Sequence, residues 1–223
     1  MNPLVDYFLH LLFPPKCMFC RELLRDEDAV YCDKCFGSLP EFEGSDPTVP
    51  GFDQALATFH YREPIRYAIL RYKFYGMRVY GPIFAGWMAV TVRDKLKESC
   101  DFVSWVPCIN LRRWKRGYDQ AEILAKALAK ELDLEARPVL RKIHNNPAQS
   151  GIDDTARRKA NVLNVYKVVD SDIIAGKSIL LVDDVLTTGA TLSECGKLLR
   201  MSHCRSLSCA VIAAAGGENE KDK

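Results

Sequence analysis

The sequence predicts an α/β protein in which a mostly parallel sheet is flanked by helices, with a small cysteine-rich module at its N-terminus. Two observations lead to this prediction. From residue 52 onward, short apolar runs typical of strands alternate with segments whose apolar residues recur every three or four positions. Strands and helices that alternate at this length favour a parallel sheet covered on both faces. Before residue 40, two CxxC pairs stand close together.

The composition is that of an ordinary globular protein. The chain has 223 residues, of which 48% are hydrophobic and 27% are charged. That length allows one good core plus a small appendage rather than two full domains. The net charge is only +2, so a nucleic-acid or membrane partner has to be argued from a local patch of the surface.

The N-terminal stretch MNPLVDYFLHLLFPP is apolar, but it lacks the positively charged start of a signal peptide and ends early at two prolines. No run approaches the roughly 18 apolar residues that a membrane-spanning helix needs. Leu4, Phe8 and Leu11 have helical spacing, so residues 1–16 are expected to form a short amphipathic helix packed on the domain. Binding to a membrane surface is the alternative. We expect no transmembrane segment and a cytoplasmic protein.

The chain is expected to divide into three parts. An N-terminal helix and cysteine module span residues 1–45, an α/β domain spans 52–216, and a polar, disordered tail spans 217–223. Residues 41–51 are rich in acidic residues, Pro and Gly, which is typical of a linker. Strands are expected at 55–61, 102–107, 138–141, 165–168, 178–183 and 206–214, and helices at 64–76, 81–98, 119–132 and 190–202.

The cysteine module has the spacing of a tetrathiolate zinc site. Cys17 and Cys20 form one CxxC pair, and Cys32 and Cys35 form a second pair after eleven intervening residues. Four thiolates would close the coordination shell, so the predicted zinc is structural. The alternative is a pair of redox or disulfide sites, but an odd total of nine cysteines without a secretion signal argues against a disulfide framework.

Residues 178–192 read as a buried strand, a polar turn and the start of a helix. The apolar run ends on Asp183 and Asp184, at the carboxyl edge where open α/β sheets bind ligands. The turn then supplies small hydroxyl residues and Gly189 at a helix N-terminus, where backbone N–H groups and the helix dipole suit a phosphate monoester. Two carboxylates beside a phosphate would repel it, so ribose hydroxyls, with Mg²⁺, are their natural partners.

This arrangement resembles the 13-residue phosphoribosyl-pyrophosphate (PRPP) fingerprint of the type I phosphoribosyltransferases, which here runs from Ile179 to Thr191. The resemblance implies that Asp183 and Asp184 hold the ribose of PRPP and act in catalysis. The residues that it implies for the 5-phosphate are Thr187, Thr188, Gly189, Ala190 and Thr191.

Two further loops are expected at the same site. The loop after Val106 is strongly basic, and fixed cations would stabilise a pyrophosphate leaving group. Its expected ligand residues are Pro107, Arg112, Lys115, Arg116 and Gly117, with Arg116 also assigned to catalysis. There are two alternatives to pyrophosphate binding: the loop is a solvated basic loop, or it is a nucleic-acid patch that uses Trp114 and Tyr118. Residues 141–161 are polar and can form a lid over the sugar phosphate, or an exposed connection.

Together these elements resemble the ComF family, the phosphoribosyltransferase-like proteins linked to competence and DNA uptake in bacteria. The resemblance covers nearly the whole chain. Besides the cysteine pairs and the fingerprint, it rests on residues 72–76 (YKFYG), Val106-Pro107, residues 116–120 (RGYDQ), and Gln149, Arg157 and Asn161, which are assigned to the flexible loop. Asp119 departs from the family pattern, in which Asn is usual. Its charge bears on ligand preference, or Asp119 serves as a helix cap.

Two functions remain open from the sequence. The first is an enzyme that binds PRPP·Mg²⁺ and transfers the phosphoribosyl group with release of pyrophosphate, although no acceptor pocket or general base beyond the lone His144 is visible. The second is a non-catalytic protein that senses a phosphoribosyl ligand or binds single-stranded DNA together with the DNA-uptake machinery. The aromatic and basic stretch 61–80 supports it. Tyr67, Tyr72 and Phe74 there either stack on bases or pack in the core.

Overall fold

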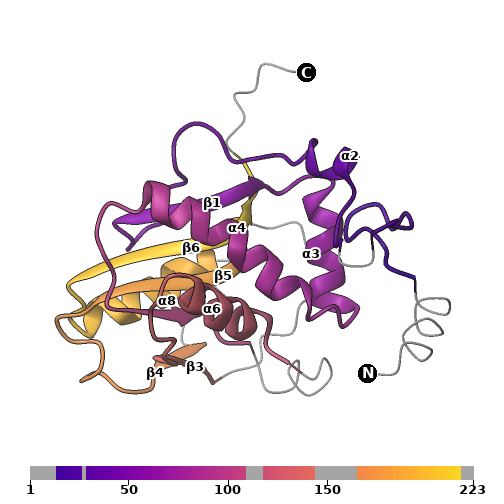
Figure 1. Ribbon diagram of the computed structural model, residues 1–223. Coiled ribbons are helices and arrows are strands. Elements are labelled where there is room, and N and C mark those ends of the chain that lie inside the picture. Colours follow the sequence, from indigo (N-terminus) through magenta and orange to yellow (C-terminus); the bar gives the residue numbers. More distant parts are fainter. Residues whose placement is uncertain (1–13, 27–28, 109–117, 144–164, 217–223) are drawn as a thin grey trace, which may run out of the picture.

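The structure is a computed structural model that describes residues 14–26, 29–108, 118–143 and 165–216. Its central sheet has four strands, all parallel, in the order β1-β6-β5-β2 (Figure 1). The strands are β1 (Gln54–His60), β2 (Phe102–Trp105), β5 (Ser178–Leu186) and β6 (Ser206–Ala214). The predicted parallel sheet is confirmed, and each strand falls within a few residues of its expected range.

Helices cover both faces of this sheet, as the near-continuous apolar strands require. In β5, Leu180 and Val182 point into one core, and Ile179 and Leu181 point into the other. The first core packs under α3 (Ile65–Phe74), α4 (Tyr80–Lys95) and α6 (Gln120–Glu131), which lie together on one face in Figure 1. The second core packs under α8 (Ala190–Met201).

Two of the predicted strands do not join the main sheet. β3 (Leu140–Lys142) and β4 (Tyr166–Val168) pair with one another in an antiparallel ribbon. Each of them has one buried residue, Leu140 and Tyr166, followed by exposed or half-buried positions. A strand inside a parallel sheet is buried on both faces, so this pattern suits a ribbon lying over the edge of the core.

Strand β5 is longer than predicted. It was expected to end at Asp183, but it continues to Leu186, with Asp183 paired to Val211 and Leu186 paired to Ala214 of β6. The long partner strand supplies backbone groups for the extra residues. Both acidic residues therefore lie on a hydrogen-bonded strand rather than in the following loop, which restricts where their side chains can go.

The cysteine module is packed into the first core. Cys35 of its helix α2 (Asp33–Phe36) is buried in that core, and Phe19 of its first CxxC turn is buried with its ring stacked 6.1 Å from that of Trp87 on α4. Tyr31 of the module and Phe59 of β1 also contact Trp87, with ring centroids 5.8 Å and 5.6 Å away. The module and the α/β domain thus share one aromatic cluster centred on Trp87.

Residues 41–51, expected to be a linker, also pack on the domain. Phe42 and Val49 are buried, and the Phe42 N–H donates to the carbonyl of Thr58 on β1 at 3.0 Å. The two apolar side chains outweigh the polar composition of this stretch. The predicted boundaries at 45, 52 and 216 remain predictions, and residues 1–13 and 217–223 lie outside the described part of the chain. Within that part, no helix is both long and apolar enough to span a bilayer.

Gly81 allows the close contact between α4 and α6, and its replacement tests that packing. A Cβ at this position would lie 2.7 Å from Ile123 Cγ2 and 3.0 Å from the hydroxyl of Tyr72. We expect Gly81→Ala to lower the free energy of unfolding by about 1–3 kcal/mol, because the added methyl group would overlap the Ile123 side chain and crowd the Tyr72 hydroxyl. Denaturant unfolding measures this.

Gly86 in the same helix is the matched control, since nothing lies within 4 Å of its added Cβ. Gly86→Ala is expected to be neutral, or to stabilise by up to about 1 kcal/mol through helix propensity. Equal effects of the two changes would contradict the packing argument.

Candidate functional site

Asp183 and Asp184 at the end of β5 share their surroundings with a lysine from a distant element. Lys73, near the C-terminus of α3, places its Nζ 2.8 Å from Asp184 Oδ1. The lysine side chain is 23% exposed and that of Asp184 is 15% exposed, so solvent screens this ion pair only in part. Asp183 also accepts a hydrogen bond from the backbone N–H of Asp184 at 2.8 Å.

The environment of Asp183 disfavours its ionised form. Burial raises the pKa of Asp183, and the neighbouring charge of Asp184 raises it further. The Lys73 charge and the Asp184 N–H lower it in part, and the resulting pKa is about 8. Lys73 is affected in turn: burial lowers its pKa, but Asp184 more than compensates, so its pKa is raised and it stays protonated. The pair therefore carries less than its full negative charge at neutral pH.

The turn after β5 leads directly into α8. Gly189 has a φ of 69° and is the N-cap of α8, so the N-cap residue itself has no side chain that could cap the first turn. A Cβ there would add strain in the left-handed region and touch Leu186 Cδ1 at 3.4 Å. Thr187 and Thr188 are exposed, and Thr188 Oγ1 accepts from the Ala190 N–H at 3.4 Å. This leaves an open helix N-terminus beside the acidic pair.

A cavity of about 230 Å³ joins these features. It is lined by residues from six parts of the fold: Lys73, Phe74, Val106, Pro107, Cys108, Asp119, Gln120, Ala121, Lys142, Tyr166, Asp183, Asp184 and Thr191. Of the predicted ligand residues, Pro107, Asp183, Asp184 and Thr191 meet here. Sequence reasoning gave no role to Lys73, Lys142 or Tyr166. The YKFYG stretch was a usable signal for Lys73, whereas the ribbon residues had none.

Three hydrogen bonds connect the end of α3 to the start of α6. The Tyr72 hydroxyl donates to the Gln120 carbonyl at 2.7 Å, and Gln120 Nε2 donates to the Lys73 carbonyl at 3.0 Å. The Tyr118 hydroxyl donates to the Tyr72 carbonyl. Through these contacts, residues 72–73 and 118–120, which belong to two of the motifs that carry the family resemblance, are held side by side at the cavity.

Asp119 is a helix cap, which was one of the two roles considered for it. Its Oδ1 accepts from the N–H groups of Ala121 at 3.1 Å and Glu122 at 3.3 Å, and its Oδ2 accepts from the Cys108 N–H at 2.7 Å. All three groups are donors, so a carboxylate suits the position, since an Asn amide would turn its own donors toward one of them. Asp119 thereby connects Cys108 to the start of α6.

Several predicted site residues lie outside the described residues. These are Arg112, Lys115, Arg116 and Gly117 of the basic loop, Gln149, Arg157 and Asn161 of the flexible loop, and also Trp114 and His144. Their roles remain predictions.

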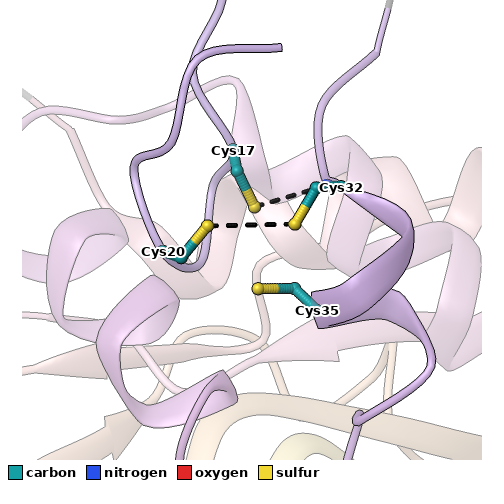
Figure 2. Close-up of side chains that lie close together, drawn as sticks. All are labelled: Cys17, Cys20, Cys32 and Cys35. Atoms are coloured by element: carbon teal, nitrogen blue, oxygen red, sulfur yellow. Dashed lines mark hydrogen bonds between the residues drawn. The ribbon is translucent and has the colours of Figure 1, made fainter.

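The predicted metal ligands do come together. The Sγ atoms of the four cysteines in the two CxxC pairs, which point toward one another in Figure 2, all lie within 4.8 Å of one another. Cys20 Sγ and Cys32 Sγ are 3.8 Å apart. That is close to the edge of a tetrahedron with metal–sulfur bonds of about 2.3 Å. The donor set fits a structural Zn²⁺ with a closed shell.

Backbone donors favour the thiolate form of Cys17, whereas burial and the neighbouring thiols raise the pKa of Cys35. Burial opposes ionisation of Cys17, but N–H groups of Cys20, Cys32 and Phe19 lower its pKa to about 7. The Cys32 N–H lies 3.4 Å from Cys17 Sγ and is one of the two contacts drawn in Figure 2. A thiolate is the form that binds zinc.

The first CxxC turn is also bonded to α3. Arg71 donates from one guanidinium nitrogen to the carbonyls of Met18 and Phe19, at 2.8 Å each. Both acceptors lie between Cys17 and Cys20, and Arg71 stands two residues before Lys73 on α3. The cysteine cluster is thus connected, through one helix, to the lysine that pairs with Asp184.

Comparison with known proteins agrees with both halves of this description. The phosphoribosyl transferase domain family matches residues 119–223, and the double zinc ribbon domain family matches residues 8–47. The chain is 29% identical to Competence protein F of Haemophilus influenzae over 205 residues, which cover 86% of this chain and 87% of that protein. The chain belongs to the ComF family. The resemblance inferred from its motifs is confirmed.

Two other relatives of this ComF-family protein match over shorter stretches. Competence protein ComFC of Streptococcus pneumoniae is 33% identical over 144 residues, covering 64% of this chain and 60% of that protein. DNA utilization protein YhgH of Escherichia coli is 28% identical over 99 residues, covering 44% of this chain and 43% of that protein.

Among solved structures, the glutamine PRPP amidotransferase from B. subtilis matches at 16% identity, with 64% of this chain and 30% of that chain covered and a TM-score of 0.45. An adenine phosphoribosyltransferase matches at 14% identity, with 66% and 75% covered and a TM-score of 0.42. Since both TM-scores lie below 0.5, the fold assignment rests on the family matches and on the observed sheet.

The raised pKa of Asp183, about 8, makes stability depend on pH. Between the ordinary carboxyl pKa and this value, the folded protein binds a proton that the unfolded chain has lost, so stability should fall as pH rises from about 5 to about 8. Asp183→Asn removes this loss. We expect the variant to gain about 1–3 kcal/mol over the native protein at pH 8, and little at pH 4.

Denaturant unfolding at several pH values measures this difference. Asp172→Asn, an exposed change in the turn before β5, is the control and should track the native protein throughout. A constant difference between Asp183→Asn and the native protein across the pH range would contradict the assignment.

Proposed function

We propose that this ComF-family protein binds PRPP, as its Mg²⁺ complex, in the cavity at the end of β5. One observation carries the proposal: Asp183, Asp184 and Thr191 of the fingerprint line the same cavity, beside the open N-terminus of α8. Carboxylates on one side suit sugar hydroxyls, and a helix N-terminus suits a phosphate. A ribose 5-phosphate has these two groups at its two ends.

The parts of PRPP are assigned accordingly. Asp183 and Asp184 accept hydrogen bonds from the ribose hydroxyls, and residues 187–191 bind the 5-phosphate. The segment that begins at Pro107 and contains Arg112, Lys115, Arg116 and Gly117 binds the pyrophosphate, which Mg²⁺ partly neutralises. Support for its location comes from Pro107 and Cys108, which line the cavity, and from Asp119, which connects Cys108 to the start of α6.

Transfer of the phosphoribosyl group is the reaction that such a site suits. As the bond to pyrophosphate breaks, positive charge develops on the ribosyl carbon. The negative charge of the Asp183–Asp184 pair stabilises it, while Arg116 stabilises the leaving group. Gln149, Arg157 and Asn161 belong to the segment proposed to close over the ligand. The acceptor has to enter between the acidic pair and the β3–β4 ribbon, where Lys142 and Tyr166 line the cavity.

The biological setting is proposed from the relatives. Those with the longest matches are named as competence proteins of two bacteria, and another as a DNA utilization protein. We infer that this protein acts in the cytoplasm in connection with DNA uptake.

Calorimetry with PRPP·Mg²⁺ tests the binding site. We expect the native protein to bind saturably and Asp183→Asn/Asp184→Asn to bind at least about 100-fold more weakly, because both carboxyl groups that accept from the ribose hydroxyls, and the negative charge of the pair, are lost. Asp170→Asn/Asp172→Asn, which makes the same two replacements at exposed positions in the turn before β5, should bind like the native protein. Absence of binding by the folded, zinc-loaded native protein would show that the fingerprint is a retained scaffold.

A second candidate function, binding of single-stranded DNA, is favoured by one surface. Tyr67 and Tyr75 are 41% and 75% exposed, and with Arg21 and Arg71 they line a depression of about 510 Å³ beside the cysteine module. Aromatic faces interspersed with cations suit stacked bases and a phosphate backbone. Tyr72, also considered for stacking, is fully buried and has no such role.

Binding of a fluorescent oligo-dT strand tests this second function. We expect Tyr67→Ala/Tyr75→Ala to weaken binding about 10-fold or more, since each stacked base contributes about 1–3 kcal/mol. Tyr67→Phe/Tyr75→Phe keeps both ring faces and should bind like the native protein, and affinity should fall steeply with salt. Unchanged binding by the alanine variant would exclude this surface.

A further inference from the structure

The ion pair between Lys73 and Asp184 occupies a carboxylate that the proposed function needs. Lys73 Nζ lies 2.8 Å from Asp184 Oδ1. A ribose hydroxyl can share that carboxylate with the lysine or replace it. An ammonium that gives up its partner in a largely buried site requires another anion nearby, because an unpaired buried charge is costly.

The position of Lys73 indicates which anion that is. Its carbonyl accepts from Gln120 Nε2 at 3.0 Å, so it stands at the start of α6, directly after the 109–117 segment. Pro107 and Cys108, directly before that segment, line the same cavity. Lys73 therefore lines one cavity with Cys108 and Asp119, the described residues that flank the segment assigned to pyrophosphate, although it comes from another part of the chain.

Hydrogen bonds from neighbouring residues hold the backbone around Lys73 in place. Arg71 is bonded to two carbonyls of the cysteine module, and Tyr72 is hydrogen-bonded through its hydroxyl to the Gln120 carbonyl at 2.7 Å. Beyond Cα, the lysine has a flexible four-carbon stem with a compact charge at its end. A fixed base and a movable charge are what a change of partner requires.

We propose that Lys73 is a further ligand-binding residue, which leaves Asp184 to the ribose and moves onto the diphosphate of the ligand. This rests on the proposed function and adds specificity to it. A ligand with a 1-diphosphate gives the lysine a new anion when it takes Asp184. Ribose 5-phosphate competes with Lys73 for Asp184, but it has no phosphate at C1 that could serve as a new anion for the lysine. Lys73 thereby selects diphosphorylated ribose over its simple 5-phosphate.

Calorimetry with three probes tests this: PRPP·Mg²⁺, pyrophosphate·Mg²⁺ and ribose 5-phosphate. We expect Lys73→Met to weaken binding of PRPP and of pyrophosphate by at least about 10-fold, because a charged hydrogen bond is lost. Binding of ribose 5-phosphate should stay within about 3-fold or become tighter, since Asp184 no longer has a competitor. Lys73→Arg, which keeps the charge, should retain most of the preference for PRPP.

Lys177→Met is the matched control. Lys177 lies 3.8 Å from Asp101 in a more exposed pair beside the other end of β5, so its loss should change none of the three affinities. If Lys73→Met does not fold, Lys73→Gln carries the same expectation.

The outcomes separate the two proposals. Equal losses for all three probes would make Lys73 a structural residue and overturn the inference, as would unchanged PRPP binding. Absence of PRPP binding by the native protein would instead overturn the proposed function itself.

Discussion

Two adjacent carboxylates at the end of a buried strand are the constraint on which this structure depends. Because β5 is covered on both faces, Asp183 and Asp184 lie next to one another near its C-terminal end and are only partly exposed to solvent. Like charges in such a place cannot both ionise freely without a cation nearby, and the pKa of Asp183, about 8, expresses that cost. Lys73 is the cation that the fold supplies. Its helix has to be held where the ammonium reaches the pair.

The packing around α3 meets that requirement from two sides. Tyr72 and Gln120 connect its C-terminal turn to α6, and Arg71 connects it to the turn between Cys17 and Cys20. A tetrathiolate metal site gives rigidity to a segment too small to have a core of its own. In this ComF-family protein the zinc module is therefore more than an appendage, because its aromatic residues and backbone carbonyls help to hold α3, which carries Lys73 at the cavity.

The same packing bears on the choice between the two proposed functions. The cavity at the end of β5 and the aromatic depression lie along one helix, α3: Lys73 lines the first, while Tyr67 and Arg71 line the second. A strand of DNA on the depression would lie on the helix that carries the cavity lysine. Ligand sensing and DNA binding are thus compatible in one molecule, whether or not a phosphoribosyl group is transferred.

The sequence by itself determined the parallel sheet, the four zinc ligands, and the strand, acidic pair and turn that end at Thr191. These features depend on local order: apolar runs, CxxC spacing and a glycine that adopts a positive φ are all visible within a few residues. The tertiary structure alone decided the rest. Lys73 meets Asp184 across more than a hundred residues, and Lys142 and Tyr166 reach the cavity through a ribbon that was expected to join the sheet. The composition of residues 41–51 predicted a linker, whereas in the structure Phe42 and Val49 of this stretch are buried against the domain. Contacts between distant segments leave no periodicity in the chain, because they are set by how helices and strands pack, and not by the residues next to them.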